Sequence, residues 1–453
     1  MAKSTPKTMR NTVIYSIFVR NYSEEGTFEA VRKDIGRIKD LGVDIIWLMP
    51  IHPIGKKERK GSLGSPYAIQ DYRKINPEFG TLEDFERLVE TIHENGLKCI
   101  IDVVYNHTSP DSWLSENHPE WFYHKPDGSF GNRVGDWSDI IDLDYSNKEL
   151  WEYQIETLKM WAKYVDGFRC DVASMVPAEF WIQAREEVER VRPGSIWLGE
   201  TVDHGFLKSN RAKKVGSWSD AEMFQAFDMS YDYDIYEKYR GYMTGKNPLS
   251  GYAEVINFQE GIFPDNYVKL RFLENHDQPR AHFYVPDEKA LRNWTAFQFF
   301  QKGAAMIYNG QEKASRRTPG LFDKDPVRWN GNGEGGNDLD LTDLFKQLIR
   351  FKKEQMIVDS SYRVHALPHD ILAAIHVENV PATAEKRGKT LFGVFSMRGE
   401  SGVVTLNDLE TNNFEKVSEV IPDGIYTNLI DGSEVEVYMG MVSCDGNPII
   451  IKA

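Results

Sequence analysis

The sequence contains little cysteine. Cys99, Cys170 and Cys444 are its three cysteines among 453 residues. They are odd in number, far apart and outside any paired CxxC spacing, and two of them lie in apolar, strand-like segments. We therefore expect buried, reduced thiols rather than a disulfide framework.

Long apolar runs are also missing. Nowhere do about 18 apolar residues follow one another, as a membrane-spanning helix requires. The first residues, MAKSTPKTMR, are polar and basic but are not followed by the apolar region of a secretory signal. The pattern predicts a cytoplasmic protein with no membrane partner, unless a signal peptide has been removed.

Positive charge is in short supply. The chain has 54 Lys and Arg against 69 Asp and Glu, which gives a formal net charge of -15. This balance disfavours phosphate backbones, so we expect no nucleic-acid partner. With 41% hydrophobic and 12% aromatic residues, a chain of this length can bury a large core and form about two or three domains.

What the sequence does contain is an alternation of short apolar runs with amphipathic segments. Helical periodicity covers residues 28–42 and 82–96, and Gly42 and Gly96 end these segments at the position of a left-handed cap. The apolar runs that we expect to be strands are 11–19, 43–49, 97–105, 165–172, 195–200, 222–228, 267–274 and 304–310. Eight such βα units predict an α/β fold, a closed (β/α)₈ TIM barrel.

Two segments depart from this alternation. About 40 residues rich in Trp, Asp, Gly and Pro separate the third strand from the next helix, and the last hundred residues alternate apolar and turn residues without a long helix. We therefore predict a catalytic barrel from residues 1–106 and 148–358, a short protruding domain B at 107–147, and a C-terminal antiparallel β-sandwich domain at 359–453.

Polar side chains gather where the expected barrel strands end, and barrel enzymes place their chemistry at these ends. Arg169 and Asp171 are two apart in one strand, so both point to the same face. A lone buried ion pair of this kind would be structural, although it stabilises a fold poorly. Glu200 and Asp277 end other strands, which brings three carboxylates to one mouth. Glycoside hydrolysis requires such a set, with one carboxylate ionised and another protonated.

Four ordered segments carry a family resemblance: DVVYNHTS, GFRCDVASM, WLGE and FLENHD. They resemble the signature segments of the α-amylase family of retaining α-glucan hydrolases and transferases. SPYAIQDYRKINPEFGT and IIDLD resemble two further family segments, and the resemblance covers about residues 12–355. It implies the same barrel, protruding domain and C-terminal β domain.

The resemblance also implies roles for the three carboxylates. Asp171 matches the nucleophile, Glu200 the general acid/base, and Asp277 the carboxylate that stabilises the oxocarbenium-like transition state. From the residues themselves we expect Arg169 to lower the pKa of Asp171. We also expect the apolar strand before Glu200 to raise the pKa of that carboxyl.

Other site residues follow from the same matches. His107 and His276 match histidines that hydrogen-bond sugar hydroxyls, and Tyr67 matches an aromatic platform for the sugar ring. Asn106 and Asp142 match positions that bind a structural Ca²⁺ in many relatives, and both offer the oxygen ligands that calcium prefers.

Two departures bear on the substrate. Ser174 and Met175 replace the usual Lys-His pair, so contacts to the leaving-group sugar differ, and Val172 after the nucleophile is frequent in α-1,6-specific relatives and α-glucosidases. The leading prediction is hydrolysis of α-1,4 bonds in maltooligosaccharides or starch-type α-glucans, which are the expected partners. An oligo-α-1,6-glucosidase or α-glucanotransferase is the alternative, and an inactive barrel that serves as a binding subunit is the remote one. The oligomeric state stays open.

Overall fold

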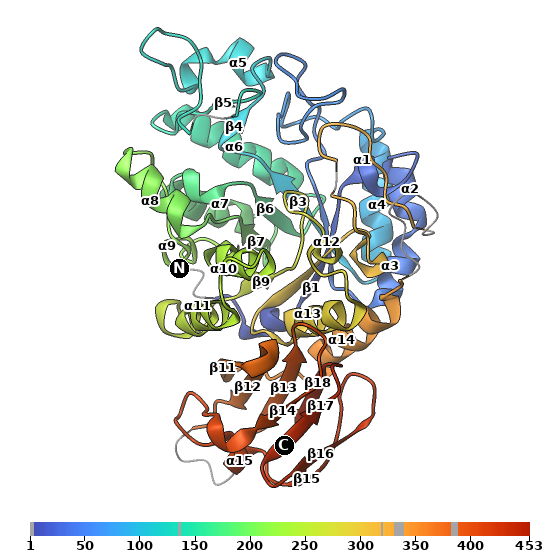
Figure 1. Ribbon diagram of the computed structural model, residues 1–453. Coiled ribbons are helices and arrows are strands. Elements are labelled where there is room, and N and C mark those ends of the chain that lie inside the picture. Colours follow the sequence, from blue (N-terminus) through green and yellow to red (C-terminus); the bar gives the residue numbers. More distant parts are fainter. Residues whose placement is uncertain (1–3, 135–136, 319, 330–338, 382–387) are drawn as a thin grey trace.

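The predicted barrel is confirmed by a computed structural model, which describes residues 4–134, 137–318, 320–329, 339–381 and 388–453 (Figure 1). Each barrel strand pairs in parallel with its neighbours, and the ring is closed. In order around the ring the strands are β1 (Val13–Ile17), β10 (Ala304–Tyr308), β9 (Lys269–Arg271), β8 (Met229–Tyr231), β7 (Ile196–Gly199), β6 (Gly167–Cys170), β3 (Lys98–Val103) and β2 (Ile45–Leu48).

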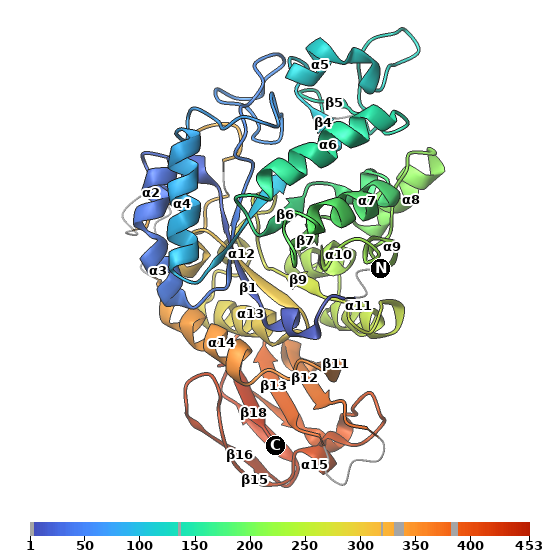
Figure 2. The same ribbon diagram turned by 180° about the vertical axis from the view of Figure 1, so that it is seen from behind.

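Helices cover the outside of the barrel, as parallel strands require (Figure 2). Both faces of the strands are buried, which explains their continuous apolar runs. The helices between the strands are α1 (Val19–Tyr22), α2 (Phe28–Lys33), α3 (Ile35–Leu41), α4 (Leu82–Glu94), α6 (Lys148–Trp161), α7 (Ala178–Glu189), α8 (His204–Ala212), α9 (Asp220–Met223), α10 (Tyr233–Met243), α11 (Leu249–Ile262), α12 (Ala281–Tyr284) and α13 (Glu288–Phe300), with α14 (Thr342–Glu354) after the last strand.

Two expected elements differ in the structure. The helix expected at 28–42 is broken at Asp34, whose carboxylate accepts hydrogen bonds from Tyr22 Oη and from Arg37 Nε, while its ψ of 2° leaves the helical range. Residues 222–228, expected to be the sixth strand, form the end of α9 and a turn instead, and β8 follows directly. A capping box formed by Ser219 and Glu222 starts α9. It favours a helix start here, whereas the apolar run alone suggested a strand.

A close contact between β6 and β7 sets the spacing of the strands that carry the central site residues. A side-chain carbon on Gly167 would lie 2.1 Å from the backbone oxygen of Ile196, so only glycine fits there. The register pairs Arg169 with Leu198 and Cys170 with Gly199. Residues just beyond the two strand ends are therefore neighbours.

The segment after β3 rises above the barrel at the top of Figure 1. It contains the ribbon of β4 (His107–Thr108) and β5 (Ile141–Asp142), the helix α5 (Trp113–Asn117) and a short 3₁₀ turn. An ion pair of 2.8 Å between Lys60 and Asp139 joins it to the loop after β2. The segment therefore borders the mouth of the barrel on one side.

The C-terminal part packs two antiparallel sheets face to face below the barrel (Figure 1). One sheet has the order β11 (Ser360–Leu367), β12 (Ile371–Glu378), β13 (Thr390–Ser396) and β18 (Ile449–Lys452) and lies against α11 and α13. The other has the order β14 (Gly402–Thr405), β17 (Met441–Cys444), β16 (Glu434–Tyr438) and β15 (Gly424–Thr427), with α15 (Val417–Val420) beside it. The three cysteines are free and buried, as expected.

In the described part of the chain, no helix is both long and apolar enough to cross a membrane.

Candidate active site

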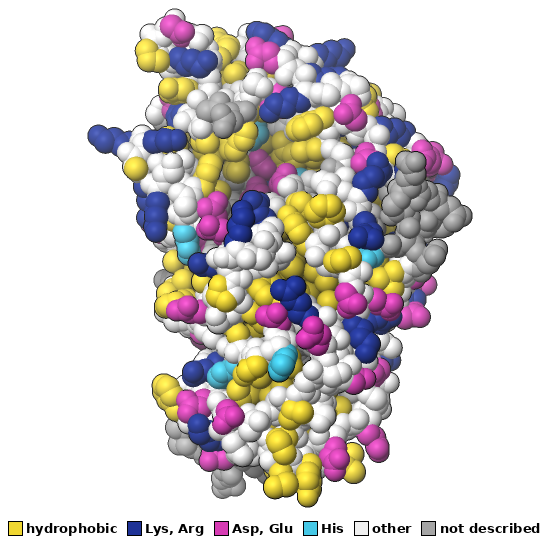
Figure 3. All heavy atoms as spheres, in the orientation of Figure 1, with side chains coloured by type: hydrophobic (Ala, Val, Ile, Leu, Met, Phe, Trp, Pro, Cys, Tyr) yellow, Lys and Arg dark blue, Asp and Glu magenta, His cyan; other side chains and the backbone are white. Residues whose placement is uncertain are grey.

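The polar residues singled out in the sequence lie together at the carboxyl ends of β3, β6, β7 and β9. Figure 3 shows a hollow in this face of the molecule, below the protruding segment, with acidic side chains inside it and hydrophobic side chains along its walls. Asp171 and Glu200 are 7% and 6% exposed, so both carboxyls are largely removed from water.

One guanidinium joins three carboxylates at the centre of the site. Arg169 is fully buried and places Nη1 2.9 Å from an oxygen of Asp102 and 2.9 Å from Oδ1 of Asp171. Its Nη2 lies 2.8 Å from Oε2 of Glu200. The same arginine therefore fixes the relative positions of Asp171 and Glu200 on adjacent strands.

The pKa values of these carboxyls are raised, because burial penalises their charged forms. The pKa of Glu200 rises to about 7, as the sequence predicted, with Arg169 opposing the shift. Arg169 acts to lower the pKa of Asp171, as expected, but it does not decide the net shift. Burial outweighs the arginine and raises the pKa of Asp171 to about 6, with neighbouring Asp102 and Asp277 acting in the same direction.

The carboxylate of Asp277 differs from those of Asp171 and Glu200. Its side chain is 40% exposed, and Oδ2 lies 3.1 Å from Nε2 of His276. Although burial acts to raise it, the pKa of Asp277 is lowered by the charge and hydrogen bond of His276. The pKa of His276 is raised, because Asp277 outweighs the cost of burying the ring. Asp277 is therefore more acidic than Asp171 and Glu200, and its carboxylate is held ionised.

Tyr67 reaches the same place from the loop after β2. Its hydroxyl contacts Nε2 of His276 at 2.7 Å and donates to Asp102 at 3.1 Å. The two rings are stacked, with centroids 5.1 Å apart and planes inclined by 16°. Tyr67 thus joins the residues that end β3 and β9.

His107 lies at the start of β4, with Nε2 4.0 Å from Asp171 Oδ2. Burial lowers its pKa to about 4, so the ring is neutral near pH 7 and can donate or accept a hydrogen bond. Its ring also faces Trp137 of the protruding segment at 5.9 Å. The structure therefore places His107 beside Asp171.

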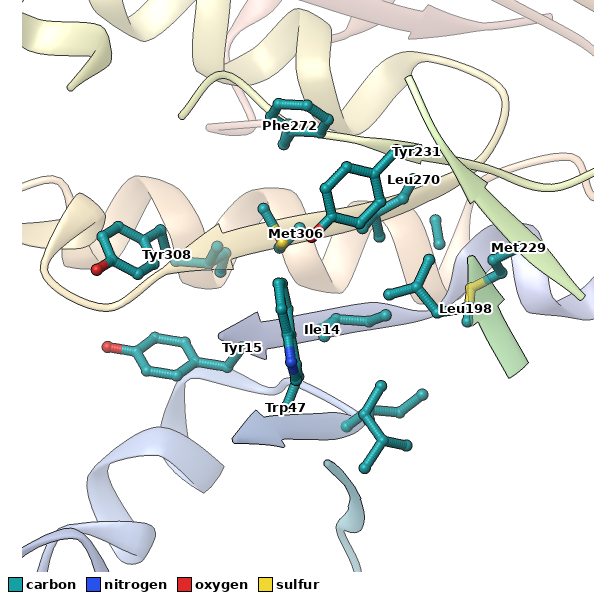
Figure 4. Packing of buried hydrophobic residues seen from close by; sticks show 14 of the residues in the cluster. Ile14, Tyr15, Trp47, Leu198, Met229, Tyr231, Leu270, Phe272, Met306 and Tyr308 are labelled. Carbon is teal, nitrogen blue, oxygen red and sulfur yellow. The ribbon is translucent and has the colours of Figure 1, made fainter. Parts of the chain in front are cut away.

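Sequence reasoning missed the aromatic residues around Arg169. The guanidinium carbon lies 5.0 Å from the ring centroid of Trp47 and 5.2 Å from that of Tyr231, and Nε donates to the Tyr231 hydroxyl at 3.2 Å. Figure 4 shows the two rings pointing toward one another inside the barrel, from β2 and β8. Such cation–π contacts hold an arginine in place. The sequence showed Trp47 as an aromatic residue near the end of an expected strand. Tyr231 was not considered, because the sixth strand was expected at residues 222–228, before β8.

A pocket of about 380 Å³ opens beside Glu200. This volume is within the usual range of small-molecule sites. Tyr236 is 6% exposed, and its hydroxyl has no hydrogen-bond partner among the described residues. The pocket is lined by Trp137, Val172, Glu200, Thr201, Val202, Asp203, Phe206, Tyr233, Tyr236, Glu237, Arg240 and Gln278.

The two calcium candidates lie at the base of the protruding segment, Asp142 in β5 and Asn106 just before β4. Asp142 pairs with His107 across the ribbon, next to Asn106, and the backbone oxygen of Asn106 accepts from Leu143. Oδ2 of Asp142 accepts the backbone N–H of Arg133 at 2.7 Å, whereas Oδ1 is buried without a partner in the described chain. Burial raises the pKa of this carboxyl. A buried carboxylate oxygen without a partner fits a hard cation. Further ligands would be carbonyls or water, since no group of three His, Cys, Asp or Glu with metal-site geometry occurs among the described residues.

Family models match most of the chain. The model described as "Alpha amylase, catalytic domain" matches residues 6–127 and 110–319, and "Bacterial Alpha amylase C-terminal domain" matches residues 363–451. Alpha-amylase 2 from Dictyoglomus thermophilum is 25% identical over 383 residues, which cover 77% of this chain and 64% of that protein. The chain thus spans about two thirds of the length of this relative.

Solved structures match over nearly the whole chain. The crystal structure of an alpha-amylase from Lactobacillus plantarum has a TM-score of 0.89 and 42% identity, and the match covers 99% of this chain and 100% of that one. A noncanonic maltogenic alpha-amylase from Thermotoga neapolitana has a TM-score of 0.81 and 30% identity, with 98% and 99% covered.

Proposed function

The chain belongs to the α-amylase family, and on this premise we propose that it is a retaining glycoside hydrolase that cleaves α-1,4-glucosidic bonds in maltooligosaccharides. The observation that carries the proposal is the contact of one buried guanidinium with both Asp171 and Glu200. Retaining enzymes need their two carboxyls roughly 5–5.5 Å apart, and two carboxyls on adjacent strands that share one arginine suit that spacing.

The reaction then runs in two steps. Asp171 attacks the anomeric carbon and forms a covalent glycosyl-enzyme, while Glu200 gives its proton to the departing glycosidic oxygen. Water then attacks the same carbon, Glu200 takes up its proton, and the bond to Asp171 breaks. A pKa of about 7 suits Glu200 to both roles, and the lower pKa of about 6 leaves Asp171 mostly ionised at neutral pH.

The remaining site residues bind and stabilise the sugar in this proposal. Asp277, ionised and partly exposed, faces the positive charge that develops at the anomeric centre. His107 and His276 hydrogen-bond the hydroxyls of the sugar that is cleaved, and Tyr67 packs against its ring. A cytoplasmic location stays a prediction.

The substrate assignment predicts a product pattern. kcat/KM per cleavable bond should be higher on maltoheptaose than on starch, because Ser174 is fully buried where the family's usual pair grips a long leaving group. The first products should be short and of α-configuration. Chromatography of digests of maltoheptaose, starch, panose and pullulan, with proton NMR of the first anomer, measures both.

Each alternative has its own outcome in this experiment. Rapid hydrolysis of panose with no action on maltoheptaose would indicate an α-1,6-glucosidase instead. Val172 favours this alternative. Products longer than the substrate would indicate a glucanotransferase. No reducing sugar from any of the glucans would leave the inactive binding subunit, a reading that the three carboxylates disfavour.

We also propose that Asn106 and Asp142 contribute oxygen ligands to a structural Ca²⁺ at the base of the protruding segment. The support is the buried, unpartnered Oδ1 of Asp142. Calcium there would hold the segment beside the mouth and would take no part in the chemical steps.

Calcium should therefore change stability rather than chemistry. At 100 times its Kd, a ligand that binds only the folded state adds about 2.7 kcal/mol to the free energy of unfolding. Excess Ca²⁺ should raise the melting temperature and chelation should lower it. Asp142→Asn should abolish this response, whereas Asp127→Asn, at an exposed position of the same segment, should keep it. An unchanged melt after exhaustive chelation, with no metal found by elemental analysis, would refute the site.

A further inference from the structure

Val172, the residue after Asp171, has an unusual backbone conformation. Its φ of 34° and ψ of 43° lie in the left-handed region, which β-branched residues rarely adopt. Strain of this kind costs free energy and persists where the surroundings enforce it. Here β6 ends at Cys170, two residues before Val172, and a 3₁₀ turn (Ala173–Met175) begins just after Val172.

The surrounding hydrogen bonds hold the chain on both sides of Val172. The backbone N–H of Asp171 donates to Val103 at 2.9 Å, which continues the pairing of β6 with β3. The carbonyl of Val172 accepts from Met175 at 2.9 Å, and the carbonyl of Ser174 accepts from Trp218 at 2.9 Å. The left-handed residue therefore connects two anchored segments.

This conformation points the backbone N–H of Val172 toward Glu200, the proposed general acid/base. The N–H of Val172 donates to Oε2 of Glu200 at 2.8 Å. The same oxygen forms an ion pair with Arg169 Nη2 at 2.8 Å, so one hydrogen bond and one positive charge hold Oε2. A proton on the carboxyl then belongs on the other oxygen, Oε1, because Oε2 is already occupied as an acceptor.

We propose that Val172 is a positioning residue for the reaction, whose strained backbone holds its N–H against Glu200 Oε2 and so leaves Oε1 to carry the transferred proton. The inference rests on the role proposed above for Glu200. It gives Val172 a backbone function that is independent of the linkage preference suggested by its side chain.

Substitution by glycine separates strain from positioning. Glycine adopts the left-handed conformation without strain but is also free to leave it. At low pH, Val172→Gly should therefore melt at or above the wild-type temperature, while it loses about tenfold in kcat/KM on an aryl α-maltoside. Val172→Asn is the matched comparison, because asparagine tolerates this conformation, and its kcat/KM should fall less than that of Val172→Gly.

The pH profile reports on the bond itself. The ionised carboxyl is the form that the N–H stabilises, so loosening this bond should raise the pKa of Glu200 and move the high-pH limb of kcat/KM upward in Val172→Gly but not in Val172→Asn. The other ionisable groups near Glu200 are unchanged in both variants and cancel in the comparison: Asp102, Arg169, Asp171, Tyr231, Tyr233, His276 and Asp277.

A second readout needs no activity. The melting temperature of Val172→Gly relative to wild type should be highest at low pH, where Glu200 is protonated, and should fall as the pH rises through about 7, where the ionised form needs the bond. A pH-independent difference, or a melting temperature lowered at every pH, would overturn the inference. Inactivity of the wild type would instead count against the proposed function and would leave this stability measurement able to decide on Val172.

Discussion

Asp171→Asn is expected to lower kcat on maltoheptaose by at least ~10³-fold, equivalent to about 4 kcal/mol of lost transition-state stabilisation. The amide cannot form the covalent glycosyl-enzyme, and nothing else in the first step replaces that bond. Folding should be preserved because the substituted side chain keeps its shape. The measurement is steady-state hydrolysis, with the melting temperature as a check on folding.

The control for this variant is Asp408→Asn, a change of the same chemistry at an exposed position of the C-terminal part. It should retain the wild-type rate. A tenth of wild-type activity in Asp171→Asn would contradict its role as nucleophile. Loss of glucan binding along with turnover would indicate that Asp171 instead shapes the site.

Glu200→Gln should separate substrates by the quality of their leaving groups. On maltoheptaose the loss should be about 10²–10⁴-fold, because the departing sugar oxygen needs a proton from a general acid. On α-maltosyl fluoride the first step should be almost unaffected, since fluoride departs without that proton. The initial burst of fluoride release, which reports the first step alone, is compared with the initial rate on maltoheptaose.

Glu90→Gln, on the exposed face of α4, is the matched control and should change neither rate. If the burst of fluoride release fell as much as the rate on maltoheptaose, Glu200 would act by position or charge rather than by proton transfer. Such a result would remove the acid/base assignment and leave the nucleophile assignment intact.

The barrel could be predicted because the sequence pattern of a strand followed by a helix is repeated many times. Continuous apolar strands and amphipathic helices recur around the ring, so one misplaced element did not change the predicted topology. The sixth strand was misplaced because the end of α9 and the turn after it carry the apolar residues Met223, Phe224 and Phe227, while β8 has only three residues. The break at Asp34 depends on Tyr22 and Arg37, whose contacts with its side chain no helical periodicity reveals.

The structure brings together residues that the sequence singled out, but the net rise in the pKa of Asp171 was not predicted. The spacing of Arg169 and Asp171 correctly placed them on one face, but the pKa of Asp171 depends on how deeply the strand end is buried. The rings of Trp47 and Tyr231, which pack around the neighbouring Arg169, come from elements distant in the sequence. The left-handed backbone at Val172 is likewise imposed by the hydrogen bonds around it and has no local sequence signal.

The central claim is that Asp171 forms a covalent bond to the substrate, and Glu200→Gln offers the most direct test. With α-maltosyl fluoride this variant should form the intermediate readily but hydrolyse it slowly, because the base for the water step is missing. Intact mass spectrometry should show one added maltosyl group, and peptide mapping should place it on Asp171. An adduct on another residue, or inverted product with no adduct at any time point, would contradict the account.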